Sequence, residues 1–251
     1  MLVAVILFTT LLLYTSVWNP KNTRHFYKQK PLYLGHRGDI HKQPENTTPS
    51  YVSALERGMG GLELDVLSTK DGVVICSHNF DLERKTAAEG MIDRIGHAQL
   101  TSIAPSVPSL EDALLAIPAN AILNIEVKTR TLWNLKTAIS VVRLIKKHKK
   151  SETTIVSSFN PLIILLTAMV DRKIYTAFIV RDIRWIWLTD WIHPDFLHAE
   201  YGLINDDIIR FVKERRVRLN AWTVNSRAGI RWLRRIGSDG IITDRPEFCR
   251  S

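Results

Sequence analysis

The stretch GGLELDVLSTKDGVVICSHN, residues 60–79, places charge inside an apolar run. Glu63 and Asp65 lie two residues apart in a segment whose other residues are typical of a buried strand. Side chains of a strand alternate between its two faces, so both carboxylates occupy the same face. Because an isolated buried charge is energetically costly, the pattern indicates that this face holds a functional site and is not part of an apolar core.

A hairpin is predicted to follow this strand. KDG (70–72) separates it from a second apolar run, VVICSH (73–78), and Asp-Gly is a strong signal for a two-residue turn. With Asp-Gly as the loop, Asp65 lies opposite His78, and directly opposed residues share a face. This register predicts that His78 joins the two carboxylates, whereas a slip of one residue would remove the argument for His78.

Outside the hairpin, short apolar runs alternate with amphipathic stretches along the chain. Eight strands separated by helices predict a single (β/α)8 TIM barrel, and no Gly-rich phosphate loop favours a doubly wound sheet instead. The predicted strands are residues 32–37, 61–67, 121–127, 153–159, 174–180, 196–201, 218–224 and 240–243. Predicted helices include residues 48–58, 109–117, 133–148 and 206–216.

Polar side chains mark the ends of three predicted strands and the return of the hairpin. In a parallel barrel the carboxyl ends of the strands meet at one mouth and build the active site. The sequence therefore predicts that three carboxylates, two histidines and two cations converge there. They are Glu63, Asp65 and Glu126, His36 and His78, and Arg37 and Lys128.

This combination of side chains predicts phosphodiester chemistry. Three buried carboxylates need compensating positive charge, and all-oxygen ligands suit one divalent cation, Mg²⁺ or Ca²⁺. Arg37 can grip a phosphate through two parallel hydrogen bonds, while Lys128 acts as a point charge. His36 and His78 titrate near neutral pH and can transfer protons.

The first 18 residues carry no charged side chain and are almost long enough to span a bilayer. No basic residue precedes the run and no small-residue cleavage site follows it, so a retained anchor at residues 1–19 is favoured over a cleaved signal peptide. A basic linker, residues 20–30, would connect the anchor to the barrel domain, residues 31–251. By the positive-inside rule, this arrangement predicts a single-pass membrane protein with a cytoplasmic catalytic domain.

The formal net charge is +9. The basic runs are compatible with solvated helix faces or with attraction to anionic lipid. No nucleic-acid-binding motif accompanies them, so nucleic acid is not expected as a partner. The two cysteines, Cys76 and Cys249, do not indicate a disulfide framework, and the oligomeric state is not indicated.

Six motifs, in order along the chain, resemble those of the glycerophosphodiester phosphodiesterases, a family with a phospholipase-C-like (β/α)8 barrel. The first two are highly specific together, and the later ones are weaker individually. They are LGHRGDIHKQPENTTPSY (34–51), LELDVLSTKDGVVICSHNFDLERKT (62–86), SLEDAL (109–114), LNIEVK (123–128), AWTVN (221–225) and GSDGIITDRP (237–246).

The resemblance implies a role for each matching residue. It implies that His36 and His78 are the general acid/base pair. It implies that the metal ligands are Glu63, Asp65 and Glu126, and that Arg37 and Lys128 bind the phosphate. Glu45 and Asn46 match a motif beside the metal site, where hydrogen bonding to the ligands is expected. Trp222 matches an aromatic residue of the pocket, although a Trp of the barrel core is equally compatible. Asn79 replaces the acidic residue that commonly follows the second histidine.

The implied reaction is metal-dependent hydrolysis of a glycerophosphodiester to glycerol 3-phosphate and an alcohol. Either water or a substrate hydroxyl, through a cyclic phosphate, would attack phosphorus. A lysophospholipase D acting on membrane lysophospholipids is the main alternative, and a lyase that releases a cyclic phosphate shares the same site. A non-catalytic, anchored anion-binding module is a further alternative.

Overall fold

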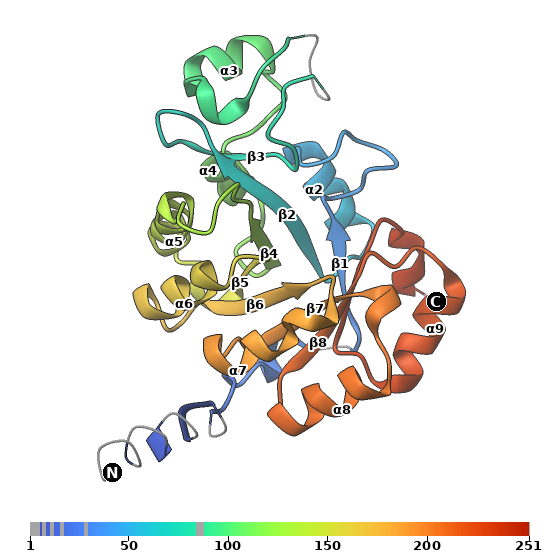
Figure 1. Ribbon diagram of the computed structural model, residues 1–251. Helices are drawn as coiled ribbons and strands as arrows, with labels where there is room; N and C mark the ends of the chain where they lie inside the picture. Colours follow the sequence, from blue (N-terminus) through green and yellow to red (C-terminus); the bar gives the residue numbers. More distant parts are fainter. Residues whose placement is uncertain are drawn as a thin grey trace.

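The computed structural model describes residues 6, 9–10, 13–15, 18–27, 30–83 and 88–250 (Figure 1). Eight parallel strands are hydrogen-bonded in the order β1-β9-β8-β7-β6-β5-β4-β2, and β1 pairs with β2 to close the barrel. The predicted TIM barrel is confirmed. The strands are β1 (Leu32–His36), β2 (Gly61–Ser68), β3 (Val74–Cys76), β4 (Ile122–Val127), β5 (Thr154–Ser158), β6 (Tyr175–Val180), β7 (Phe196–Glu200), β8 (Arg218–Trp222) and β9 (Gly240–Thr243).

Helices connect the strands and pack around the barrel (Figure 1). Ser109 and Asp112 form a reciprocal capping box at the start of α4, and Asn205 caps α8. Both helices were predicted from the sequence, over residues 109–117 and 206–216. The α-helices are α2 (Thr48–Glu56), α3 (His97–Ile103), α4 (Leu110–Ala116), α5 (Lys136–Lys147), α6 (Pro161–Val170), α7 (Thr189–Ile192), α8 (Asp206–Arg215) and α9 (Arg227–Ile236). The 3₁₀ turns are η1 (Arg24–Phe26), η2 (Ile92–Arg94), η3 (Ser151–Thr153), η4 (Ile183–Leu188), η5 (Tyr201–Leu203) and η6 (Pro246–Arg250).

The strands bury two separate apolar layers. Along β2, Leu62, Leu64 and Val66 belong to the large cluster between the strands and the helices. A smaller cluster, which includes Leu34 and Ile155, fills the barrel interior. Glu63 and Asp65 alternate with the outward-facing apolar residues and therefore point into the barrel. The alternation of side chains along this strand, predicted from the sequence, thus places the apolar residues in the core and the two carboxylates in the site.

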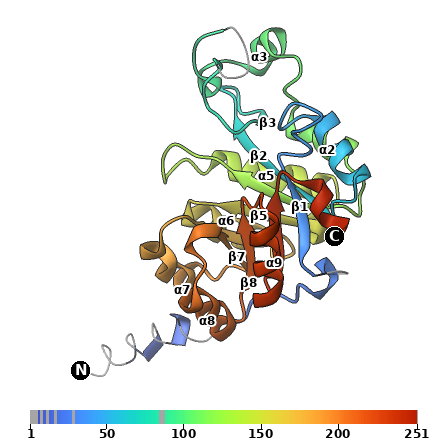
Figure 2. The same cartoon turned by 90° about the vertical axis from the view of Figure 1, so that its right-hand side faces the viewer.

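A small lobe extends from the β2–β3 hairpin, away from the barrel (Figure 2). It contains α3 and has its own apolar cluster, in which Leu67 and Ile75 of the hairpin pack with Ile92 and Leu100. The lobe therefore stabilises the hairpin from outside the barrel.

The residues expected to form a basic linker close the base of the barrel. Phe26 is buried in the interior cluster, where its ring centroid lies 4.6 Å from that of Tyr175. Lys21 Nζ lies 2.7 Å from Asp195 Oδ2, immediately before β7, and donates to the Ile174 carbonyl oxygen. The described part of residues 20–30 is therefore an integral piece of the barrel.

The predicted single-pass membrane location is wrong. Over the described residues, no helix combines the length and the apolar character needed to cross a bilayer. Lys30, in the predicted basic linker, pairs through its Nζ with Asp239 Oδ1 at 2.6 Å at the barrel base. Most of the predicted anchor, residues 1–19, lies outside the described residues.

Replacing Phe26 with Ala is expected to lower the free energy of unfolding by about 3–5 kcal/mol, because the change leaves a cavity at the barrel base. Urea denaturation followed by circular dichroism measures this loss. Trp133→Ala is the matched control, since its ring is 82% exposed and its removal should change stability by less than about 0.5 kcal/mol. Equal losses in the two variants would contradict the closing role of Phe26.

Candidate active site

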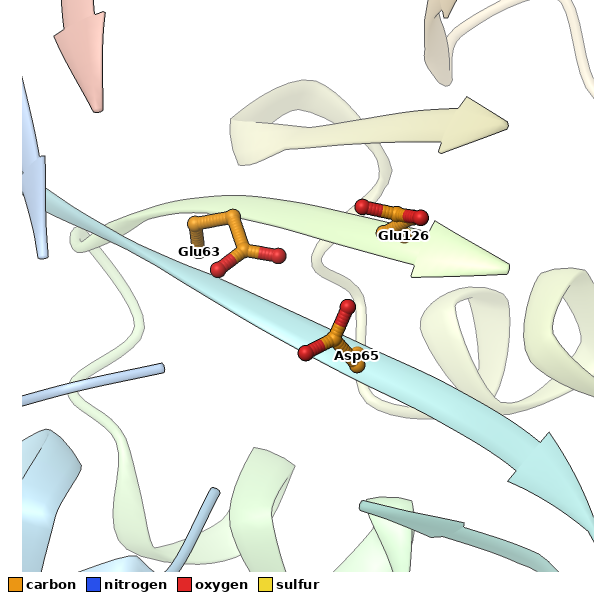
Figure 3. Close-up of side chains that lie close together, drawn as sticks. All are labelled: Glu63, Asp65 and Glu126. Carbon is orange, nitrogen blue, oxygen red and sulfur yellow. The ribbon is translucent and has the colours of Figure 1, made fainter. Parts of the chain in front are cut away.

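Glu63, Asp65 and Glu126 bring their carboxylates together inside the barrel (Figure 3). The parallel pairing of β2 with β4 sets Asp65 opposite Glu126 and Glu63 opposite Asn124. An oxygen of each carboxylate lies within 4.8 Å of an oxygen of each of the others. Glu63 and Asp65 are buried, and Glu126 is half-buried. The three predicted metal ligands therefore form one compact group of oxygen donors.

Two cations lie against this group. Lys128 Nζ is 2.5 Å from Glu126 Oε1 and 3.0 Å from Asp65 Oδ1. Arg37 Nε is 3.1 Å from Asp65 Oδ2, at an angle that makes the contact an ion pair and not a hydrogen bond. Asp65 is therefore compensated from both sides, whereas Glu63 has neither cation's side chain as an ion-pair partner among the described residues.

The pKa values follow this uneven compensation. Burial raises the pKa of Glu63 to about 8, and the charge of Asp65 adds to the shift. Burial and Asp65 also raise the pKa of Glu126, although Lys128 opposes them. Burial likewise favours the neutral form of Asp65, but Lys128 and Arg37 outweigh it and lower the pKa of Asp65. The group therefore has more carboxylate than its own cations can neutralise.

The β1–α2 loop places the two residues expected beside the metal site. Arg37 donates from its backbone N to Glu63 Oε2 and from Nη1 to Glu45 Oε2, at 3.0 and 2.8 Å. Asn46 donates from Nδ2 to Asp65 Oδ2 and accepts from the Asp65 backbone N, each at 3.0 Å. Arg37 and Asn46 have φ values of 56° and 55°, in the left-handed region. Glu45 thus orients Arg37, and Asn46 orients Asp65.

His36 is oriented by a carboxylate that was not singled out from the sequence. Its Nδ1 lies 2.8 Å from Asp244 Oδ1, at the end of β9. Burial disfavours the charged ring, but the Asp244 hydrogen bond and the charge of Glu63 outweigh burial and raise the pKa of His36. Asn225 donates to Asp244 Oδ2 and accepts from its backbone N. Both residues lie in quoted motifs just beyond strand ends, which is the signal that could have identified them.

His78 reaches the site, although the predicted register is wrong. Val66 pairs with Cys76, and Ser77 N donates to the Asp65 carbonyl oxygen, so Ser77 lies opposite Asp65. The reason is a longer loop. Lys70 N donates to the carbonyl of Ile95 in the lobe, and the Thr69–Val73 hydrogen bond closes three residues instead of two.

The ring of His78 is held by its neighbour. Its Nδ1 lies 2.9 Å from Asn79 Oδ1. Burial lowers the pKa of His78, and the positive charges of Lys128 and Arg37 lower it further, against the charge of Asp65. The amide oxygen of Asn79 therefore accepts a hydrogen bond from His78, as the carboxylate of an acidic residue at this position could.

One cavity of about 190 Å³ joins these groups at the carboxyl ends of the strands. His36, His78 and Lys128 all line it. Trp222 lines it too, with Nε1 donating to the His198 carbonyl oxygen at 3.0 Å. Sequence reasoning also missed several lining residues, of which three polar or aromatic ones lie outside all of the family motifs. They are Phe159, Arg181 and His198.

Residues 36–248 match the sequence model of the glycerophosphoryl diester phosphodiesterase family. The chain belongs to this family. This is the family that the sequence motifs resemble, so the protein is a phosphodiesterase. The matched range contains every residue of the site described above.

Named relatives align with most of the chain. The phosphodiesterase is 27% identical to the glycerophosphodiester phosphodiesterase of Caldanaerobacter subterraneus subsp. tengcongensis, over 87% of this chain and 96% of the relative. It is similar to the structure of a Thermotoga maritima glycerophosphodiester phosphodiesterase, with 26% identity, a TM-score of 0.77 and coverage of 88% and 98%. An Oleispira antarctica phosphodiesterase, whose structure contains the product sn-glycerol-3-phosphate, has the same fold, with 23% identity, a TM-score of 0.80 and coverage of 88% and 95%.

The buried carboxylate of Asp39 anchors the loop that carries Arg37 and Asn46. The Asp39 carboxylate accepts from Ser53 Oγ at 2.8 Å and from Arg57 Nη1 at 3.0 Å. Burial alone would raise the pKa of Asp39, but these two partners outweigh it and lower the pKa. The phosphodiesterase thereby fixes the loop to α2.

Asp39→Asn is expected to lower the free energy of unfolding at pH 7 by about 1–3 kcal/mol, because the buried side chain at this position loses its charge-assisted contacts with Arg57 and Ser53. A carboxylate whose pKa is depressed by folding stabilises the protein above its unfolded pKa of about 3.9. That contribution disappears as the pH falls through the folded pKa of Asp39, so the difference between the two proteins should shrink there.

Urea denaturation across this pH range measures the difference. Glu152→Gln removes a carboxylate that is 73% exposed and serves as the control, with a change below about 0.5 kcal/mol. A difference for Asp39→Asn that does not depend on pH would refute the ion-pair account.

Proposed function

We propose that this phosphodiesterase hydrolyses glycerophosphodiesters to glycerol 3-phosphate and an alcohol, using one divalent cation and two histidines. The observation that carries the proposal is the convergence of carboxylates, cations and histidines around one cavity at the barrel mouth. The structure of the Oleispira antarctica phosphodiesterase contains the product sn-glycerol-3-phosphate, which supports glycerol 3-phosphate as one product of this reaction.

Glu63, Asp65 and Glu126 would hold the cation. Their fit to such an ion rests on three clustered oxygen donors and on the pKa values of Glu63 and Glu126, which are raised by burial and by the charge of Asp65. All-oxygen donors suit Mg²⁺ or Ca²⁺ better than zinc. When bound, the cation would supply Lewis-acid polarisation of a phosphoryl oxygen.

Arg37 and Lys128 would bind the phosphate of the substrate. Both line the cavity, and both are held in place by carboxylates, Arg37 by Glu45 and Lys128 by Glu126. Burial disfavours the charged form of Lys128, but Asp65 and Glu126 outweigh it and raise its pKa, so Lys128 stays positively charged at neutral pH. Fixed positive charge beside the phosphate would stabilise the additional negative charge of the transition state.

His36 and His78 would move the protons. In hydrolysis the oxygen of the nucleophile bonds to phosphorus and the bond from phosphorus to the alcohol oxygen breaks. With water as the nucleophile, one histidine takes a proton from the water and the other gives a proton to the leaving oxygen. With the glycerol hydroxyl as the nucleophile, the same proton transfers release the alcohol and leave a cyclic phosphate, which water then opens to glycerol 3-phosphate. Asp244 and Asn79 each hold Nδ1 of one ring, which leaves Nε2 for the substrate.

Alanine at His36 or His78 is expected to reduce kcat for glycerophosphocholine by about 10²–10⁴-fold, the usual contribution of a general acid or base. Mass spectrometry of the products, with Mg²⁺, Ca²⁺ or chelator, measures this. His25→Ala is the control, because His25 packs at the barrel base and should leave kcat unchanged. Full activity in both site variants would eliminate the histidine roles.

Glu63→Gln is expected to weaken binding of Ca²⁺ or Mg²⁺ by at least about tenfold, in line with the loss of one charged ligand. Isothermal titration calorimetry of the whole protein measures the affinity without any need for turnover.

The same variant should be at least as stable as the original protein in chelator at neutral pH. A carboxyl whose pKa is raised by folding destabilises the protein at pH values above its unfolded pKa of about 4.3, because folding then requires the group to take up a proton, and Gln removes that cost. Thermal unfolding with and without cation tests this. Unchanged cation affinity would show that Glu63 is not a ligand.

A further inference from the structure

A second, larger cavity adjoins the catalytic one. It has a volume of about 820 Å³ and lies between the loops that follow β4, β5 and β6. Phe159, Ile179 and Arg181 line both cavities, so the two are continuous. Whatever extends from a phosphate in the catalytic cavity can therefore enter the second one, which we call the side groove.

The walls of the side groove are largely apolar and open to solvent. Leu132 projects from the β4–α5 loop, and Trp185 and Trp187 project from η4. Trp185 is 55% exposed and Trp187 is 51% exposed, which is unusual for large apolar side chains. Large exposed apolar surfaces on a folded domain mark ligand or partner sites, and this one leads directly into an active site.

The charge distribution distinguishes the two ends of the combined cavity. Arg37 and Lys128 lie at the catalytic end. At the junction, Arg181 forms no ion pair with any residue that the structure describes, and beyond it the side groove offers mainly carbon. A ligand that complements this arrangement has an anionic phosphate at one end and one hydrocarbon chain at the other.

We infer that the side groove binds the hydrocarbon chain of a lysophospholipid while its phosphodiester lies in the catalytic cavity. The inference rests on the proposed function and specifies its substrate class. A small glycerophosphodiester would fill only the catalytic end. A lysophospholipid would use both cavities, and its hydrolysis would release lysophosphatidic acid and the head-group alcohol.

The test compares glycerophosphocholine with 1-acyl-glycerophosphocholines of four, six and eight acyl carbons, all kept below the concentration at which they form micelles. If the chain lies in the side groove, kcat/KM should rise with chain length, by up to about fourfold for each methylene buried. Mass spectrometry identifies the lysophosphatidic acid product and distinguishes this cleavage from loss of the acyl chain.

Trp185→Ala and Trp187→Ala supply the structural test. Each should flatten the rise with chain length and lower kcat/KM for the eight-carbon substrate by at least tenfold, while activity on glycerophosphocholine stays within twofold. Trp133→Ala is the matched control, because Trp133 is an exposed Trp of the neighbouring β4–α5 loop that does not line the side groove. It should leave the chain-length dependence unchanged.

The outcomes separate this inference from the proposed function. Turnover of glycerophosphocholine without any chain-length dependence, or equal losses in the two groove variants and Trp133→Ala, would overturn the side-groove inference alone. No turnover of any substrate with either cation would overturn the proposed function.

Binding gives a readout that does not depend on turnover. Calorimetric titration with hexyl- and octylphosphocholine should show tighter binding of the longer chain, lost in Trp187→Ala. Equal affinity for both chains would also overturn the inference.

Discussion

The buried negative charge on β2 and β4 is the constraint on which the rest of the site depends. Three carboxylates share a space in which, among the residues that the structure describes, only the side chains of Arg37 and Lys128 form ion pairs with them. A buried charge without a partner costs several kcal/mol, so the barrel must either protonate part of the group or gain a positive ion. The raised pKa of Glu63 corresponds to the first outcome, and the proposed cation corresponds to the second.

The barrel provides the rigidity that such a charge cluster needs. Parallel pairing sets Asp65 beside Glu126, and the outward-facing residues of β2 lock the strand against the helices. The β1–α2 loop adds Asn46, which holds both the side chain and the backbone of Asp65. Asp39 fastens that loop to α2 through Arg57. Stability and function therefore depend on the same short loop.

Much of this arrangement could be predicted because it follows from local rules. Strand alternation predicts the shared face of Glu63 and Asp65, and strand ends predict the convergence with Glu126. The register of the hairpin could not be predicted, because a distant carbonyl, that of Ile95, draws Lys70 out of the turn. Similarly, the N-terminal basic segment looked like a linker because its partners, including Asp195, are remote in sequence. The side groove forms between three loops, and the sequence of each loop alone contains no pattern that predicts it.

The most direct test of the central claim is anomalous diffraction from crystals of the protein soaked in Mn²⁺, which can replace Mg²⁺ or Ca²⁺ at an all-oxygen site. The account predicts one strong anomalous peak within about 2.0–2.6 Å of oxygens from Glu63, Asp65 and Glu126. A peak elsewhere, or none at this position while Lys128 still bridges Asp65 and Glu126, would contradict it. The charge of the cluster would then be balanced by protons and side chains alone.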